Sequence, residues 1–436
     1  MSKCACTHPF SRHTSSGCSV SGCSCPYGTA AQTNQKSGYQ LLVNPLDAMI
    51  SGPHIDIESI DKQAHIAFPC YVKNDQSWNK IEILWNEFHE HYENKKWTTV
   101  LEVMDKIIQI KPDDQYAYMY KAYALDELKQ YDDAIRCLNA SLDIDDKFAR
   151  AMHIKGIVLN NLERYNDAIT FFDKALEIDP KYKKSLYNKG VALMHLKQYH
   201  NAIQCCDEVL DIDSKYYYAI HNKALALTNL KKHEEAIVWW DKGLVVNPND
   251  AWMMSDKGTA LGSLKKHEDA IVWYDKALAI EPKYVRALGN KANSLNNIQR
   301  HEEAIVWHDK ALAINPKYLY SLNGKGVALM HLRKWDEAVV WYDKALEINP
   351  DYVDSLNNRA NIMNHLGKYE EAVVWYDKAL AIEPKYVHAL NNKGLTLNSL
   401  RKYEEAIVWL DKALAIDPND VGALSNKGLT LRNLRK

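Results

Sequence analysis

Proline recurs at intervals of 34 residues, or a multiple of 34, along most of this 436-residue chain. The prolines of this series are Pro112, Pro180, Pro248, Pro282, Pro316, Pro350, Pro384 and Pro418. A strict period of this length predicts a repeat array, in which each repeat packs on its neighbours and no central core is needed. Counting back from the prolines gives ten repeats over residues 81–420 and a half repeat over 421–436. The repeats begin at residues 81, 115, 149, 183, 217, 251, 285, 319, 353 and 387.

Each repeat has the apolar spacing of two helices. In the repeat 319–352, apolar or small residues recur at helical spacing in two runs, Leu322, Gly326, Leu329 and Leu332, then Ala338, Tyr342, Ala345 and Leu346. Asn349 and Pro350 are expected to end the second helix, because proline disfavours the helical conformation of the residue before it. The chain is therefore expected to be all-α.

Small residues hold two positions of the repeat, numbered from its first residue. Position 8 is Gly or Ala from the second repeat onward, and position 20 is Ala in most repeats. Glycine inside a helix costs about 1 kcal/mol relative to alanine. Its recurrence at position 8 therefore predicts the close approach of a neighbouring helix.

These positions, with an aromatic residue at 24, Ala at 27 and Pro at 32, resemble the signature of the tetratricopeptide repeat family over residues 81–436. The resemblance implies a right-handed superhelical solenoid of stacked helix-turn-helix units, whose first helices line a concave groove. It also implies a protein-protein interaction scaffold. The first repeat departs from the signature with Phe88, Val100 and Ile107, as is typical of a terminal repeat.

Asparagine is concentrated at the positions that, in this family, face the groove. An amide offers both donors and acceptors to a peptide backbone, so a ladder of amides suits an extended partner segment of varied sequence. The alternative is that these residues are ordinary solvent-facing polar positions. We predict a peptide-binding groove made of Asn188, Asn222, Asn290, Asn293, Asn297, Asn358, Asn361, Asn364, Asn392 and Asn426, with Tyr218 and Trp252 as aromatic members.

Charged residues recur where the family usually has leucine. Position 7 is Lys or Arg in every repeat from residue 115 onward, and position 25 is Asp in most repeats. An unpaired ammonium is not buried, so the head of this side chain should reach water or an acid. We expect Lys-to-Asp pairs between successive repeats, against the alternative of separately solvated charges. The tryptophans at position 23 are expected to pack on the outer helix.

The first 80 residues differ in composition from the repeats. Residues 1–40 are rich in Ser, Gly and Cys and are expected to form a disordered tail, whereas 41–80 could cap the first repeat. Thiolates suit zinc and copper(I). The candidate metal ligands are Cys4, Cys6, Cys18, Cys23 and Cys25. They give an alternative function, a metal- or redox-responsive regulator that uses the repeats for docking.

Composition narrows the remaining classes of function. The formal net charge is -2, which provides no basic field for nucleic acid. No apolar stretch reaches the roughly 18 residues that cross a bilayer, so a cytoplasmic protein is expected. No nucleophile-base pair, glycine-rich phosphate loop or carboxylate pair stands apart from the repeat pattern. We therefore expect no enzyme activity and no cofactor in the repeats.

Overall fold

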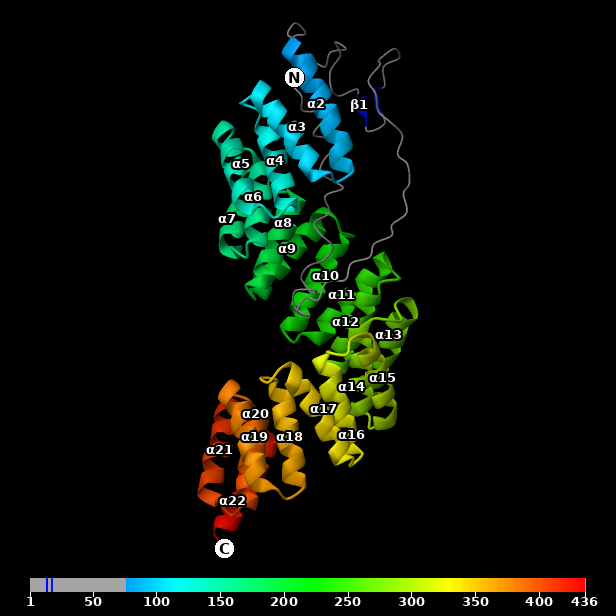
Figure 1. The fold of residues 1–436 in the computed structure, drawn as a ribbon, viewed down its shortest axis with the longest axis vertical. Helices are drawn as coiled ribbons and strands as arrows, with labels where there is room; N and C mark the ends of the chain where they lie inside the picture. Colours follow the sequence, from blue (N-terminus) through cyan, green and yellow to red (C-terminus); the bar gives the residue numbers. More distant parts are fainter. Residues whose placement is uncertain (1–12, 15–16, 19–75, 436) are drawn as a thin grey trace. The chain divides into compact units, whose positions relative to one another are not determined.

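The computed structural model describes residues 13–14, 17–18 and 76–435 (Figure 1). Strands β1, His13–Thr14, and β2, Gly17–Cys18, form an antiparallel pair in which His13 lies opposite Cys18. Of the candidate metal ligands, Cys4, Cys6, Cys23 and Cys25 lie outside the described residues. The expected tail and capping segment likewise fall almost wholly outside them.

Residues 76–435 form helices joined by short turns, which confirms the all-α prediction for this range. The first helices of the repeats are α2 Gln76–Glu93, α4 Gln115–Glu127, α6 Ala149–Asn161, α8 Lys183–His195, α10 Tyr217–Asn229, α12 Ala251–Ser263, α14 Val285–Asn297, α16 Leu319–His331, α18 Val353–His365, α20 Val387–Ser399 and α22 Val421–Leu434. The second helices are α3 Trp97–Ile110, α5 Tyr131–Ile144, α7 Tyr165–Ile178, α9 Tyr199–Ile212, α11 His233–Val246, α13 His267–Ile280, α15 His301–Ile314, α17 Trp335–Ile348, α19 Tyr369–Ile382 and α21 Tyr403–Ile416.

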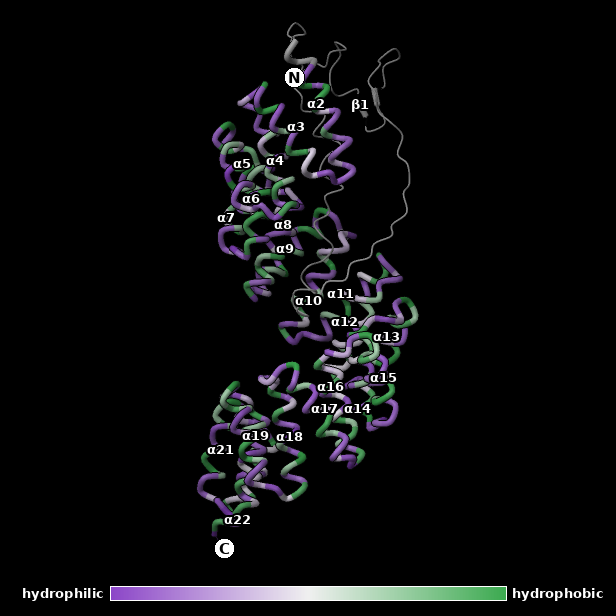
Figure 2. The backbone as a smooth tube through the Cα atoms, in the orientation of Figure 1, coloured by the Kyte–Doolittle hydropathy of each residue, from purple (hydrophilic) through white to green (hydrophobic). Residues whose placement is uncertain are grey.

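The described helices belong to two compact parts, residues 1–226 and 227–436. Within each part, a first helix packs on the second helix of its own repeat and on the first helix of the next repeat. Hydrophobic and hydrophilic segments alternate along these helices, as repeated amphipathic helices require (Figure 2).

The turn between the two helices of a repeat has the same geometry throughout. Position 15 has a positive φ, for example 59° at Lys129 and 61° at Lys265, and it is glycine only at Gly367. The next residue donates its backbone N–H to position 11, as Gln130 does to Leu125 at 2.8 Å. This left-handed residue closes the end of the first helix and reverses the chain.

The small residue at position 8 accommodates a side chain from the second helix of the same repeat. In four repeats the residue at position 24 covers a glycine: Phe172 over Gly156, Tyr274 over Gly258, Tyr342 over Gly326 and Leu410 over Gly394. A Cβ added at Gly326 would lie 2.5 Å from the Tyr342 ring, which is itself fully buried. The glycine is therefore needed for this ring to reach the first helix.

Replacing Gly326 by Ala is expected to lower the free energy of unfolding by about 1 kcal/mol. Overpacking costs about 1–3 kcal/mol, and the gain in helix propensity returns only about 1 kcal/mol. Gly428 holds the same repeat position but would place a Cβ with no atom within 4 Å. Gly428→Ala is the matched control and should not destabilise the chain. Urea unfolding followed by circular dichroism measures both, and equal effects of the two substitutions would contradict the steric explanation.

Candidate functional site

Asparagines of successive first helices hydrogen-bond to one another in residues 227–436. The amide nitrogen at position 6 donates to the amide oxygen at position 5 of the preceding repeat: Asn358 to Asn323 at 3.1 Å, Asn392 to Asn357 at 3.4 Å and Asn426 to Asn391 at 2.9 Å. We did not predict the position-5 members. The sequence feature that could have indicated them is an Asn-Asn pair at positions 5 and 6, which occurs in the two consecutive repeats that start at 353 and 387.

Asn361 connects two of these bonds into one group. Its amide oxygen accepts from the Tyr376 hydroxyl at 2.6 Å and from Asn392 at 3.0 Å, and its nitrogen donates to Asn358 at 3.5 Å. Both donors of Asn392 are thus used, while its amide oxygen has no partner among the described residues. Asn358, Asn361 and Asn392 therefore form a connected amide network with unused acceptor capacity.

Besides Asn426, four other predicted asparagines of this part lie outside that network. Asn290 donates to the Thr259 hydroxyl at 3.2 Å, and Asn364 accepts from the Thr396 hydroxyl at 3.1 Å. Asn293 hydrogen-bonds to the side chain of Tyr320. Asn297 is exposed at the end of α14.

In residues 1–226 the predicted amides are buried. Asn188 and Asn222 are each 5 % exposed, and Asn188 donates to the backbone oxygen of Lys184 at 3.1 Å. Tyr218 packs among aromatic rings, with its centroid 6.1 Å from that of Tyr187 and 5.9 Å from that of Tyr216.

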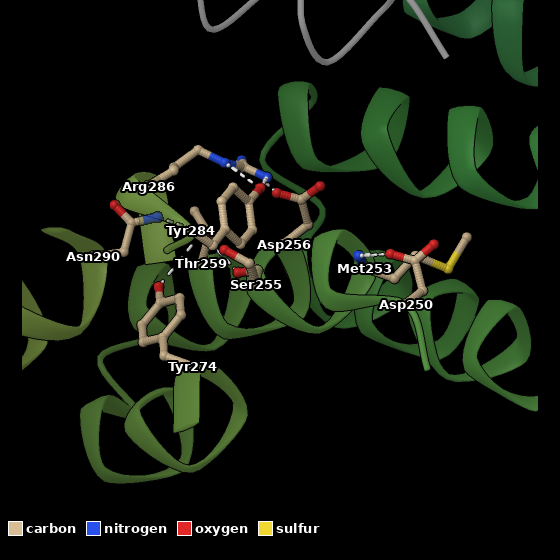
Figure 3. A network of polar contacts seen from close by, with 9 residues as sticks. All are labelled: Asp250, Met253, Ser255, Asp256, Thr259, Tyr274, Tyr284, Arg286 and Asn290. Atoms are coloured by element: carbon tan, nitrogen blue, oxygen red, sulfur yellow. Dashed lines mark hydrogen bonds and ion pairs between the residues drawn. The ribbon is translucent and has the colours of Figure 1, made fainter. Parts of the chain in front are cut away.

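Trp252 is the exposed member of an aromatic and ionic cluster on α12 and at the start of α14. Its side chain is 43 % exposed and stacks on Tyr284, with ring centroids 5.4 Å apart. The Tyr284 hydroxyl accepts from Arg286, whose guanidinium pairs with Asp256 at 2.6 Å (Figure 3). The side chains of Arg286 and Asp256 are only 17 % and 6 % exposed. The Tyr284 ring on which Trp252 stacks is therefore held in place by a largely buried ion pair.

The Asp256-Arg286 pair interrupts the amide ladder, because Asp256 holds position 6, where most repeats from 183 onward have Asn. Burial acts to lower the pKa of Arg286, but the Asp256 carboxylate and the Tyr284 hydroxyl together outweigh it, so the pKa is raised. The guanidinium thus stays charged. Sequence reasoning missed this pair because a single Asp among asparagines gave no signal of its partner.

The predicted Lys-to-Asp pairs between repeats are confirmed. The cation at position 7 contacts the carboxylate at position 25 of the preceding repeat, 16 residues earlier, as in Lys189-Asp173 at 2.7 Å and Lys325-Asp309 at 2.5 Å. Where position 25 is Asn139, Lys155 donates to its amide oxygen at 2.6 Å. The other pairs are Lys121-Asp105, Lys223-Asp207, Lys257-Asp241, Lys291-Asp275, Arg359-Asp343, Lys393-Asp377 and Lys427-Asp411.

Asp126 is a buried carboxylate at position 12 of the first helix α4. Burial raises its pKa to about 6, even though Asn161 donates to both carboxylate oxygens, at 2.9 and 3.1 Å, and so favours the charged form. Its ionisation therefore disfavours the folded state.

Across 13–14, 17–18 and 76–435, no three His, Cys, Asp or Glu side chains gather as metal ligands would. Within the same ranges, every helix is too short or too polar to cross a membrane.

The chain belongs to the tetratricopeptide repeat family. Sequence models described as tetratricopeptide repeat or TPR repeat together match more than half of it, over residues 121–183, 184–216, 253–284, 285–318, 320–352, 341–374, 360–400 and 387–420. The comparison with curated proteins found no match.

Solved structures with this fold include a tetratricopeptide repeat protein from Parabacteroides merdae. It is 17 % identical, with a TM-score of 0.52 over 57 % of this chain and 98 % of that one. Yeast Tom70 is 12 % identical, with a TM-score of 0.44 over 83 % of this chain and 96 % of that one. YrrB, described as a TPR protein with an unusual peptide-binding site, is 24 % identical, with a TM-score of 0.32 over 43 % of this chain and 97 % of that one. The first of these similarities supports the fold alone.

Asp256→Asn is expected to lower the free energy of unfolding by about 3 kcal/mol, because it leaves the buried Arg286 charge without its counter-ion. The control is Asp309→Asn, whose carboxylate is 49 % exposed in the pair with Lys325. That change should cost no more than about 1 kcal/mol. Urea unfolding at neutral pH compares the two variants. A loss at Asp256 as small as that at Asp309 would show that the Asp256-Arg286 pair contributes little.

Stability should depend on pH through Asp126. Its pKa is about 6 in the folded chain and about 3.8 when unfolded, so the folded state binds the proton more tightly. The contribution of Asp126 to the free energy of unfolding should therefore be largest below about pH 4 and fall by about 2 kcal/mol as the pH rises to about 6. Asp126→Asn should lose this component and keep an acceptor for Asn161. Urea unfolding of the original chain and of Asp126→Asn from pH 4 to 7 tests this prediction. If the free energies of unfolding of the two proteins changed in parallel with pH, the role of Asp126 would be refuted.

Proposed function

We propose that this chain is a non-enzymatic scaffold that binds an extended segment of a partner protein along its first helices. Membership of the tetratricopeptide repeat family supports a protein-protein interaction scaffold. The more specific proposal is that the first-helix amides hold the partner's backbone and that Trp252 contributes an aromatic contact.

The amide network is the observation that carries the specific proposal. Hydrogen bonds between successive repeats fix each side chain in one orientation, which lowers the entropy lost when a ligand binds. The amide oxygens of Asn290, Asn392 and Asn426 remain without partners among the described residues. These acceptors recur at the same repeat position, so they can receive backbone N–H groups from an extended chain.

The rigid aromatic cluster supports the same use of this face. Trp252 is exposed, yet its ring is stacked on Tyr284, and Arg286 fixes the Tyr284 hydroxyl. Tryptophan and arginine are enriched among the residues that dominate binding energy at interfaces. A side chain of the partner can therefore gain apolar contact at Trp252 without ordering a flexible ring first.

Replacing Asn290, Asn392 and Asn426 by Ala is expected to weaken peptide binding about thirtyfold. Each lost hydrogen bond is worth about 0.5–1 kcal/mol. The ligands are peptides selected on the full chain from a random display library, and their affinities are measured by calorimetry. Selected peptides that bind the triple variant as tightly as the original chain would refute the amide role.

Two asparagines in the exposed turns between repeats give the matched control. Asn249→Ala and Asn419→Ala remove amides outside the first helices and should leave the affinities unchanged. Circular dichroism checks that both variants keep the helical content of the original chain.

The N-terminal cysteines support a second, separate proposal. Five cysteines stand in the first 25 residues, a density that suits zinc or copper(I). Metal analysis of the purified chain with and without residues 1–30 tests this proposal. Equal metal content in the two proteins would exclude a metal role for this segment.

A further inference from the structure

The outer face of the second helices changes character along the chain. In the first four repeats, positions 22 and 29 are polar: Glu102 and Gln109, Arg136 and Asp143, Thr170 and Glu177, Gln204 and Asp211. In the next six repeats, position 22 is always Val and position 29 is apolar in all but one: Val238 and Val245, Val272 and Ala279, Val306 and Ala313, Val340 and Glu347, Val374 and Ala381, Val408 and Ala415. We call this second set the outer stripe. All of it lies within residues 227–436.

The outer stripe is exposed although the fold does not require apolar residues there. Its six position-22 valines are 51–54 % exposed, and Val245 is 82 % exposed. Valine forms helices less readily than the Glu, Arg or Gln found at the same position in the earlier repeats. The stripe therefore neither fills the core nor favours the helix. A row of exposed apolar side chains of this kind is typical of an interaction surface.

Tryptophans at position 23 lie beside the stripe and are fixed by cations on two sides. The Trp273 ring has the ammonium groups of Lys257 and Lys276 each 3.9 Å from its centroid. Lys257 also pairs with Asp241 of the preceding repeat, and its side chain is only 9 % exposed. The same arrangement recurs around Trp307, Trp341, Trp375 and Trp409. The surface near the stripe is thus ordered, and its position-7 cations are already neutralised.

We propose that the outer stripe is an interface between two copies of this chain, paired antiparallel about a two-fold axis. The occupant must offer apolar contacts at the same repeat spacing over six repeats, and a second copy of the array does so. Consider a second helix of one copy packed antiparallel on a second helix of the other copy, with the two-fold axis passing between positions 25 and 26. Position 22 of one copy then faces position 29 of the other. The same alignment places Asp at 25 opposite Lys at 26 of the other copy.

Charge also favours a second copy over a differently charged partner. Each second helix from α13 to α21 carries Asp at position 25 and Lys at position 26, which face each other in this alignment, so its outer face is self-complementary in charge. The net charge of the whole chain is only -2, so repulsion between two copies is weak. This interface is independent of the peptide-binding proposal, because it uses the second helices and leaves the first helices free.

The test is the mass of the full chain in solution, measured by sedimentation equilibrium under reducing conditions from about 1 to about 100 µM, so that mass action reveals a dimer. We expect the mass of two chains at the higher concentrations. A variant with Val306→Thr, Val340→Gln and Val374→Glu, residues taken from the same position of the earlier repeats, should have the mass of one chain throughout.

A milder variant keeps the test decisive if the polar one folds poorly. Val306→Ala, Val340→Ala and Val374→Ala raise helix propensity and remove only apolar area, so the dimer dissociation constant should rise at least about tenfold. The matched control changes three exposed apolar residues away from the stripe, Ile83→Thr, Val421→Gln and Leu424→Glu. It should remain a dimer.

Three results would overturn this interface. The unmodified chain could be monomeric at every concentration, both stripe variants could associate as strongly as the unmodified chain, or the control could dissociate as readily as the stripe variants. None of these results depends on peptide binding, which the display library measures separately.

Discussion

The contact between the side chain at position 24 and the small residue at position 8 determines most of this structure. It sets the distance between the two helices of a repeat, because a ring such as Tyr342 lies directly on the backbone of its partner helix. Ala at position 20, fully buried in repeats such as the one with Ala338, keeps the facing helix equally close. Since interiors are close-packed, repeats that share this contact present their other residues at the same offsets.

Constant offsets explain why the same inter-repeat bonds recur. Residues 35 positions apart meet as amide pairs on the first helices, as in Asn358 and Asn323. Residues 16 positions apart meet as ion pairs near the second helices, as in Lys325 and Asp309. The two faces of the stack thus carry different chemistry on one scaffold. The first-helix face carries amides, and the outer face combines paired charges with exposed valine.

The repeat pattern in the sequence was enough to predict the helices and the pairing of position 7 with position 25. Both follow from periodicity, because a residue that recurs in every repeat meets the same neighbour each time. The Asp256-Arg286 pair could not be predicted, since it depends on an aspartate that occurs only once at position 6. The amide-to-amide bonds were missed for a different reason. Periodicity placed Asn358 and Asn392 on the first helices, but whether an amide bonds to a neighbour or to a ligand depends on its rotamer.

The left-handed residue at position 15 affects how the array unfolds. Nearly every repeat holds a lysine, arginine, glutamate or glutamine in a backbone conformation that costs such residues roughly 1 kcal/mol. A single helix hairpin therefore contains a strained turn residue, and the apolar surface that would contact its neighbours is exposed to water. Adjacent hairpins compensate for both, so hydrogen exchange should be slowest in the middle of a stack and fastest at its terminal helices.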